Sequence, residues 1–246
     1  MAFTNAVDAW MSRITGYRGT MSVASVNITA TIAPNDGSGG ILGSAGPTSA
    51  SIQDEDGIAG GAKFALTTNG EMNFDSEDID NLETNGTLGA VIEHELGHVL
   101  GIGTLWDTNS FTSPAFAGTQ SIYTDGTGQY TGAAGLAAWQ TEFGQPGATF
   151  VPVELGGGDG TANGHWNEVD DGAGLTGITQ AGTGKDFRNE LMTGWLNAPT
   201  FVSQLTLNSL QDIGYTVAVP VPEPLVGGFA ALASMAFLLR HRRART

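Results

Sequence analysis

The segment from His94 to His98, His-Glu-Leu-Gly-His, constrains this chain of 246 residues more than any other. Two histidines four residues apart lie on one face of an α-helix, so both imidazoles can bind the same metal ion. Glu95 is rotated by about 100° around the helix, so its carboxylate can reach a metal-bound water without being a ligand. The segment therefore predicts a helix that carries a hydrolytic metal site.

The residues around this segment support the same interpretation. A helix is predicted from Leu88 to Leu100, with Thr87 as its N-cap and Gly101 and Gly103 after its end. Its remaining sides are apolar, which predicts burial, and a buried histidine beside a buried glutamate requires a partner. We therefore favour a metal site over two ordinary helical histidines.

His165 is the candidate for a third ligand, because the chain has four histidines and His241 lies in a basic tail. The alternative for His165 is a histidine in an exposed, glycine-rich loop. Three neutral imidazoles leave the fourth position of Zn²⁺ open for a water whose pKa falls toward about 7. Glu95 would take a proton from that water as general base.

The composition limits the other possibilities. With 40% hydrophobic and 14% charged residues, the chain is typical of a globular protein, with one sizeable core or two small lobes. Residues 1 to 220 contain five basic and 24 acidic residues, so we expect no nucleic-acid partner. The chain has no cysteine, which leaves histidine and carboxylate as metal ligands.

Periodicity predicts a mixture of helices and strands. The N-terminus is expected to form an amphipathic helix whose core face contains Phe3, Ala6, Val7, Trp10, Met11 and Ile14. Strands are expected at residues 21–32 and 62–67, and further helices at residues 75–82, 133–143 and 205–213.

The acidic residues between Asp75 and Asp80 allow two interpretations. They could hold a structural Ca²⁺, or they could form a solvated acidic face. We favour the solvated face, because the ligand pattern of an EF-hand loop is absent.

The last 27 residues form a separate unit, residues 220–246. Val221 to Pro224 read Val-Pro-Glu-Pro, residues 225–239 are apolar or small, and Arg240 to Arg245 are mostly arginine. Fifteen helical residues span about 22 Å, less than the ~30 Å hydrocarbon core, and flanking arginines could make up part of the difference. A core helix is less favoured, because the segment is apolar on all sides.

This tail resembles the PEP-CTERM sorting signal of bacteria in all three parts. The resemblance implies export, transient membrane anchoring by residues 225–239, processing near Pro222 to Pro224 by an exosortase-type enzyme, and a final place at the cell surface or outside the cell. Such proteins begin with a secretory signal, whereas Met1 does not start one. We therefore expect the true N-terminus to lie upstream of Met1.

Residues 88–106 resemble the metzincin metallopeptidases, in which a glycine follows the second histidine after two residues, as Gly101 does here. The third ligand of most metzincins would fall at Thr104. In the leishmanolysin-like branch an insertion precedes a third histidine in a His-Trp context, which Gly164-His165-Trp166 matches.

Glu190 to Thr193, Glu-Leu-Met-Thr, resembles the segment that carries the methionine of the metzincin Met-turn, and the likeness covers most of residues 3–217. It implies that His94, His98 and His165 bind zinc, that Glu95 is the base and that Met192 is the structural Met-turn residue. Some metzincins have a tyrosine two positions after this methionine, where this chain has Gly194.

We therefore expect an α+β fold: a metzincin-like, two-lobed peptidase domain at residues 1–219, with a twisted N-terminal sheet, the active-site helix and a C-terminal lobe. A C-terminal apolar helix follows. The expected function is zinc-dependent endopeptidase hydrolysis of proteins or peptides, by an enzyme that is itself exported and sorted to the cell surface. The alternatives are an extracellular surface or matrix binding module with a structural metal, and a zinc hydrolase of non-peptide bonds. The sequence leaves the natural substrate and the oligomeric state open.

Overall fold

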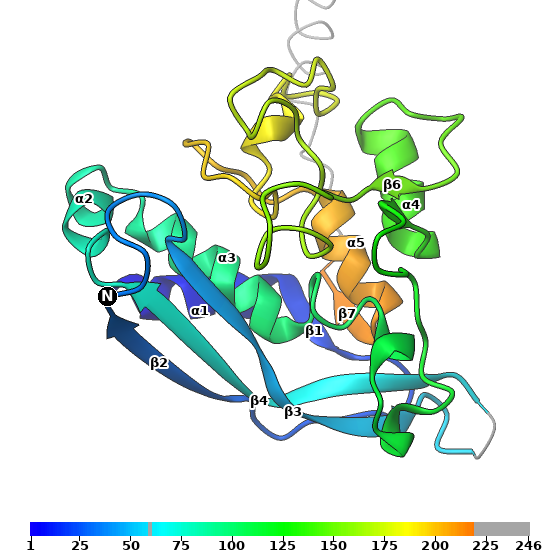
Figure 1. The fold of residues 1–246 in the computed structure, drawn as a ribbon. Helices are drawn as coiled ribbons and strands as arrows, with labels where there is room; N and C mark the ends of the chain where they lie inside the picture. Colours follow the sequence, from blue (N-terminus) through cyan, green and yellow to red (C-terminus); the bar gives the residue numbers. More distant parts are fainter. Residues whose placement is uncertain (59–60, 219–246) are drawn as a thin grey trace, which may run out of the picture.

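A computed structural model describes residues 1–58 and 61–218 and has a mixed α+β fold (Figure 1). The predicted α+β class is confirmed. The predicted sorting tail, residues 220–246 with the apolar helix at 225–239, lies outside the described residues. In the described part of the chain, no helix combines the length and apolar character needed to cross a membrane.

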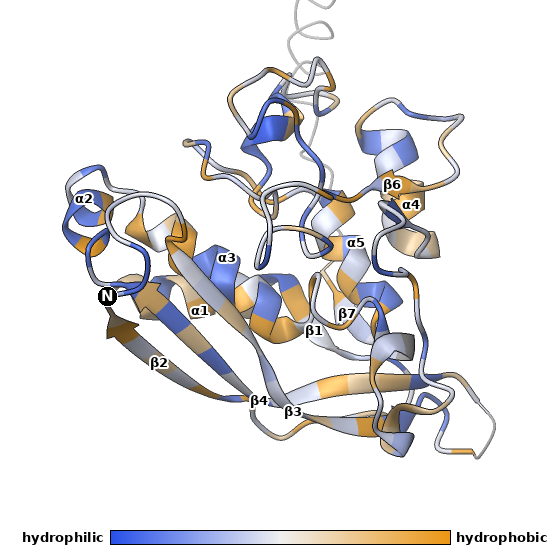
Figure 2. Cartoon of the chain, viewed as in Figure 1, coloured by the Kyte–Doolittle hydropathy of each residue, from blue (hydrophilic) through white to orange (hydrophobic). Residues whose placement is uncertain are grey.

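A three-stranded sheet forms the N-terminal part, in the order β2 (Asn27–Ala33), β4 (Lys63–Asp75), β3 (Gly43–Asp54). β2 runs parallel to the central strand β4, and β3 runs antiparallel to it. Apolar and polar residues alternate along the second half of β4, and its apolar residues are buried (Figure 2). β2 is exposed along its whole length.

Two helices pack above this sheet. α3 (Leu88–Leu100) contacts β3 and β4, and α1 (Ala2–Arg13) lies beside α3 (Figure 1). The Trp10 indole of α1 donates a hydrogen bond to the Glu93 carbonyl of α3 at 2.8 Å.

Fewer residues of α1 are buried than its apolar pattern predicted. Of its helical residues only Ala6 and Trp10 are buried, whereas Phe3, Val7 and Met11 are exposed. One narrow stripe is enough to contact α3, so the rest of the apolar face remains in solvent.

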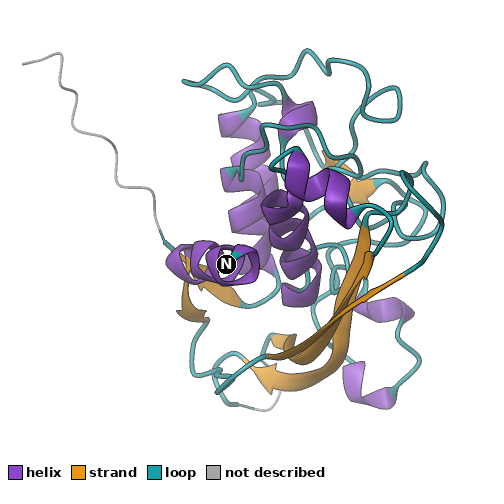
Figure 3. Ribbon diagram, turned by 90° about the vertical axis from the view of Figure 1, so that its left-hand side faces the viewer, coloured by secondary structure: helices purple, strands orange, loops and turns teal. Residues whose placement is uncertain are grey.

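The C-terminal part is mostly loops, drawn in teal in Figure 3, around two helices. These are α4 (Ala133–Glu142) and α5 (Gln204–Asp212), which pack together (Figure 1). Its remaining elements are small: α2 (Ile79–Thr84), β5 (Gln129–Tyr130) paired with β6 (Val151–Pro152), and the 3-10 helices Thr108–Ser110, Pro114–Phe116 and Phe187–Asn189. β1 (Ile14–Tyr17) pairs antiparallel with β7 (Tyr215–Val217), so segments about 200 residues apart lie side by side.

The helices were predicted more closely than the strands. α3 has the predicted bounds, and α4 and α5 each lie within one residue of theirs. The strand expected from residue 21 begins at Asn27, the strand expected at 62–67 extends to Asp75, and the helix expected from residue 75 begins at Ile79. β3 was not predicted, because its small residues, glycines and proline lack the apolar alternation of a strand.

Candidate metal centre

α3 ends in a glycine turn that also fixes one of its histidines. Gly101 has φ +112°, and the N–H groups of Gly101 and Ile102 donate to the carbonyls of His98 and Gly97, each at 3.0 Å, which is the Schellman pattern. The turn brings the Ile102 carbonyl back to the helix, where it accepts a hydrogen bond from His98 Nδ1 at 2.9 Å. The glycine that ends α3 therefore also orients the His98 ring.

His165 is positioned by its neighbour Trp166, which is fully buried. The Trp166 ring lies 4.5 Å from that of Trp106, just beyond α3, and its indole donates to Thr206 of α5 at 2.9 Å. Its main-chain N–H donates to the Met192 carbonyl at 3.0 Å. Trp166 therefore connects the loop of His165 to α5, to Met192 and to the segment after α3.

A glycine allows this loop to approach α3. Gly103 has φ +75°, and a Cβ atom at this position would lie 2.1 Å from the main-chain oxygen of Gly164. Only a residue without a side chain permits such an approach. His165 follows directly and is 5% exposed, so it is not the surface-loop histidine of the alternative interpretation.

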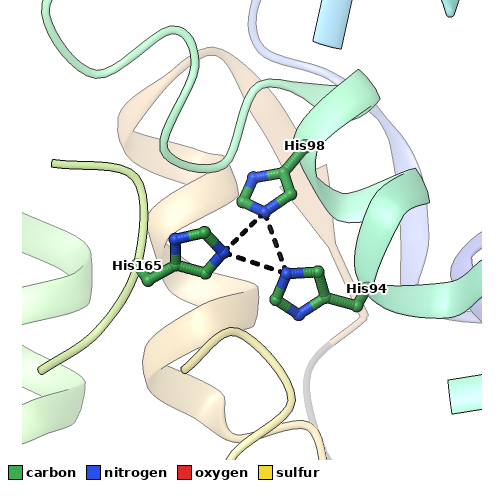
Figure 4. Close-up of side chains that lie close together, drawn as sticks. All are labelled: His94, His98 and His165. Atoms are coloured by element: carbon green, nitrogen blue, oxygen red, sulfur yellow. Dashed lines mark hydrogen bonds between the residues drawn. The ribbon is translucent and has the colours of Figure 1, made fainter. Parts of the chain in front are cut away.

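The three histidines converge on one point (Figure 4). His94 and His98 project from α3 and His165 from its loop, and their Nε2 atoms lie 3.0 Å from one another in all three pairs. The group meets the geometric requirement for a shared metal ion. The structure therefore places these histidines close enough together to bind a metal ion.

The second nitrogen of each ring shows why a cation fits at this point. Each Nδ1 faces a main-chain carbonyl, which only accepts hydrogen bonds, so each Nδ1 must carry the ring proton. The pairs are His94 with Leu191 at 2.6 Å, His98 with Ile102 at 2.9 Å and His165 with Thr161 at 2.8 Å. In the neutral rings all three Nε2 atoms then present lone pairs to one another, an arrangement that a cation stabilises.

Burial keeps these rings neutral. It lowers the pKa of His165 to about 3, with a contribution from His94. It lowers the pKa of His98 well below the usual range, and the other two histidines add to this decrease. Burial also lowers the pKa of His94. Neutral imidazole is the form that binds metal ions, so the rings are ready for ligation near neutral pH.

Glu95 is buried on α3, with 4% of its surface exposed, and its Oε2 atom has no hydrogen-bond partner. Burial raises the pKa of this carboxyl to about 8. On the sheet side Glu95 touches the start of β3, where a Cβ atom on Gly43 would lie 2.9 Å from Glu95 Oε1. An unpaired buried carboxylate with this pKa can accept and release a proton near neutral pH.

Met192 packs against α3 between the two helical histidines. It is fully buried, and a Cβ atom on Gly97 would lie 2.7 Å from the Met192 sulfur and 3.3 Å from the ring of Trp10. Gly97 therefore provides the space in α3 that Met192 fills. The family resemblance predicted Met192 close to the candidate metal site, but the sequence did not show why residue 97 is a glycine.

Glu190 holds the turn that contains Met192, a role that the sequence did not reveal. This buried carboxylate accepts hydrogen bonds from the Met192 N–H, the Ser203 N–H and hydroxyl, and the Thr206 hydroxyl of α5. Burial raises its pKa, and these hydrogen bonds oppose the increase. A glutamate in an apolar segment, two residues before the methionine, is the signal that could have indicated this role.

Two threonines at the ends of α3 form hydrogen bonds to the main chain. Thr104, where most metzincins would have a ligand, donates its hydroxyl to the His98 carbonyl at 2.7 Å. Thr87 is the residue before α3, but its side chain makes no cap hydrogen bond and instead donates to the Leu82 carbonyl. The Thr87 side chain therefore does not cap α3 as predicted.

The acidic stretch after β4 serves the neighbouring loop. The Asp75 carboxylate accepts hydrogen bonds from the main-chain N–H groups of Asp36, Gly37 and Glu77, and these lower its pKa. Asp78 accepts one from Gly39. Both residues are buried, so they do not belong to the solvated face that we favoured. Both carboxylates therefore accept main-chain hydrogen bonds that hold the turn at residues 36–39.

The comparisons with known proteins add no relative: the chain matches no protein-family model, and no curated protein matches it in sequence.

Proposed function

We propose that this chain is a zinc-dependent endopeptidase of the metzincin type, with His94, His98 and His165 as zinc ligands and Glu95 as general base. The proposal rests on one observation: the Nε2 atoms of three histidines converge, and a buried glutamate, Glu95, lies on the helix that carries two of them.

The donor set favours zinc. Imidazole suits Zn²⁺, and catalytic zinc sites characteristically use three protein ligands, whereas structural sites use four. The histidines are the three donors that the described residues bring together. When bound, Zn²⁺ supplies a Lewis acid that lowers the pKa of water and polarises a carbonyl group.

Glu95 would move the proton of the reaction. A carboxyl with a pKa of about 8 is a stronger base than an ordinary glutamate and still gives up its proton near neutral pH. Glu95 would take a proton from the attacking water and pass it to the nitrogen of the leaving amine. Its burial keeps bulk water from competing for that proton.

The sheet supports a polypeptide substrate. β3 is at the edge of the described sheet, lies along α3 and begins at Gly43, which contacts Glu95 (Figure 1). An extended peptide can add to such an edge through main-chain hydrogen bonds. It would then run past the catalytic carboxylate, which suits cleavage within a chain.

The metzincin assignment extends to the architecture. We propose that the sheet with α1 and α3 forms the N-terminal lobe, and that the loops with α4 and α5 form the C-terminal lobe. Met192 takes the place of the Met-turn methionine. Its contact with Gly97, between the two helical ligands, supports this assignment.

The location of the protein is proposed from its tail. Export, transient membrane anchoring by residues 225–239 and processing by an exosortase-type enzyme fit the Pro-Glu-Pro segment, the apolar stretch and the terminal arginines. Fractionation of cells that export the chain behind an added secretory signal, with and without Glu223→Ala, tests this proposal. The variant should stay with the membrane, whereas release equal to that of the wild type would contradict the proposal.

The peptidase proposal is tested with Glu95→Gln, which preserves the shape of the side chain. We expect the variant to keep its fold and its zinc and to lose at least 100-fold in cleavage of an unfolded protein, because the base is removed. Zinc content is measured by atomic absorption and cleavage by fluorescent peptide release. Glu83→Gln, an exposed carboxylate on α2, is the matched control and should cleave like the wild type.

Full turnover by Glu95→Gln would remove Glu95 from the mechanism. A folded, zinc-loaded wild type that cleaves no unfolded protein would contradict the peptidase proposal and favour the binding module with a structural metal.

A further inference from the structure

β2 is an edge strand without the features that usually protect one. It pairs with β4 over all seven of its residues, with no bulge, and forms one edge of the sheet (Figure 1). In the described part of the chain, no other strand pairs with its outer edge. Natural proteins commonly place charged residues, proline or bulges on exposed edges, and β2 has none of these. Its main-chain groups are therefore open to pairing with another strand.

The sequence of β2 reads the same in both directions around its centre. Residues 28–32 are Ile-Thr-Ala-Thr-Ile, with Ala30 in the middle. If two copies of β2 pair antiparallel about Ala30, each isoleucine lies opposite an isoleucine and each threonine opposite a threonine. Paired threonines can form hydrogen bonds across strands, and β-branched residues pack well on a pleated surface. The strand is therefore complementary to itself.

The isoleucines of β2 form an apolar row on the side of the sheet that faces the helices. Ile32 lies next to the buried Phe74 of β4 in the register, and Ile28 shares its side of the strand. Both isoleucines are exposed, Ile32 to 58%. A groove of about 240 Å³ separates Ile32 from Phe3 of α1, and its lining is apolar except for Glu83.

α1 extends this apolar surface. Phe3, Val7 and Met11 follow one another at intervals of one helical turn, and all three are exposed. The Phe3 ring contacts Phe74 edge-on, with the ring centroids 5.7 Å apart, so this stripe begins beside the groove. Burial of the stripe by a second copy would explain why the apolar face of α1 is broader than its contact with α3.

We propose that β2 is a dimerisation strand. Two copies of the chain pair through β2 in antiparallel orientation about Ala30, and the two three-stranded sheets become one sheet of six strands. Such a contact is two-fold symmetric and closed, because each copy uses the same strand.

Charge favours this contact over the rest of the surface. Residues 1 to 220 contain five basic and 24 acidic residues, so two copies repel each other over most of their surfaces. β2 is uncharged, and the acid beside it in the sheet is Glu71 of β4, next to Thr29. In the dimer the two Glu71 side chains are at least three strand spacings, or about 14 Å, apart. This separation exceeds the Debye length of about 8 Å at physiological ionic strength, so their repulsion is largely screened.

The size of the contact sets its expected strength. A seven-residue edge is about 23 Å long and about 10 Å thick, so it buries on the order of 400 Å² from each copy. The α1 stripe brings this area closer to the roughly 800 Å² per partner of a standard interface. We therefore expect a reversible dimer with a Kd in the micromolar range. β3 remains free at both ends of the joined sheet, so the proposal does not depend on the proposed peptidase activity.

Crosslinking tests the position of the contact, because the chain contains no cysteine. Ala30→Cys places one thiol at the proposed two-fold axis, and Ala181→Cys, an exposed alanine in the C-terminal part, is the matched control. The full chain is treated with a short bis-maleimide in a mild detergent, at concentrations above the expected Kd. We expect covalent dimers of Ala30→Cys only. Equal crosslinking of both variants would mean that another segment brings the copies together, and dimers of neither would also overturn the proposal.

Ala30→Glu and Ala30→Lys test the register. Each variant places like charges opposite each other at the axis, so each should sediment as a monomer in analytical ultracentrifugation. An equimolar mixture should form dimers, because opposite charges then meet, whereas a folding defect would not be restored by mixing. Wild-type dimerisation of either variant alone, or a mixture of two folded variants that stays monomeric, would overturn the proposal.

Discussion

At the scale of single residues, burial sets how the stability of the metal-free chain depends on pH. The pKa values of Glu95 and Glu168 are both raised to about 8 by burial, far above the value near 4.5 expected in the unfolded chain. Between these values the folded state binds more protons than the unfolded state, so stability falls as the pH rises. The lowered pKa values of the three histidines act in the opposite direction, but their effect is complete above about pH 7.

We therefore expect the melting temperature of the metal-free protein to fall between pH 7 and about 8.5 and then to level off. Glu168→Gln has no proton to lose at this position, so its melting temperature should fall less over the same range. Thermal unfolding in a chelator at several pH values measures both slopes. Equal slopes for the variant and the wild type would show that Glu168 has an ordinary pKa.

The site residues differ in how far the sequence could indicate them. His94, His98 and His165 are recognisable because a metal requires particular donors, and the chain has few histidines. Glu168 is one of 25 acidic residues, and nothing in the sequence around it indicates that its side chain is buried. Its neighbours Glu154, Gly194 and Trp195 come from other parts of the sequence, and only folding brings them close to Glu168.

At the scale of elements, two glycines of α3 provide a matched test of the packing beneath the metal centre. A Cβ atom on Gly97 would collide with Met192 and press on Trp10, whereas a Cβ atom on Gly89 would meet nothing within 4 Å. Gly97→Ala should therefore destabilise the protein by about 1–3 kcal/mol through overpacking. Gly89→Ala should stabilise it by up to about 1 kcal/mol, because alanine favours the helix.

Chemical unfolding of both variants measures these changes. Gly97→Ala should also weaken metal binding, since Met192 lies between the turns that carry His94 and His98. Equal stability of the two alanine variants would show that Met192 moves aside without cost, and the contact would then have no part in shaping the centre.

The predictability of the elements follows their local signals. α3 combines an apolar periodicity with glycines at its end, and its bounds were predicted correctly. β3 lacks an alternation of apolar residues. It pairs with β4 along one edge, and its small residues allow it to lie close to α3. Its strand conformation depends on that pairing, so it could not be predicted from the residues of β3 alone.

At the scale of the whole molecule, a metal at the histidines would join parts of the chain that are 67 residues apart. Zn²⁺ at 100 times its Kd should stabilise the folded state by about 2.7 kcal/mol. For a domain of this size that corresponds to an increase in melting temperature of about 5–10 °C. Calorimetry of the zinc-loaded protein, followed by addition of a chelator, should show the increase and its loss.

His165→Ala should unfold at the same temperature with and without Zn²⁺ at these concentrations, because two histidines on one helix bind metal weakly and join nothing distant. A zinc-dependent increase equal to that of the wild type would mean that His165 is not a ligand.

The sequence by itself determined the class of the fold, the bounds of α3 and the identity of three metal-binding candidates. It could do so because helical periodicity and ligand chemistry are local properties of the residues. Only the tertiary structure decided that the three Nε2 atoms meet, since Trp166 and Gly103 position His165 through contacts with distant segments. The tertiary structure also decided the pKa values of Glu95 and Glu168. Every glutamate has a similar pKa in the unfolded chain, and only the folded surroundings exclude water from these two carboxyls and raise their pKa.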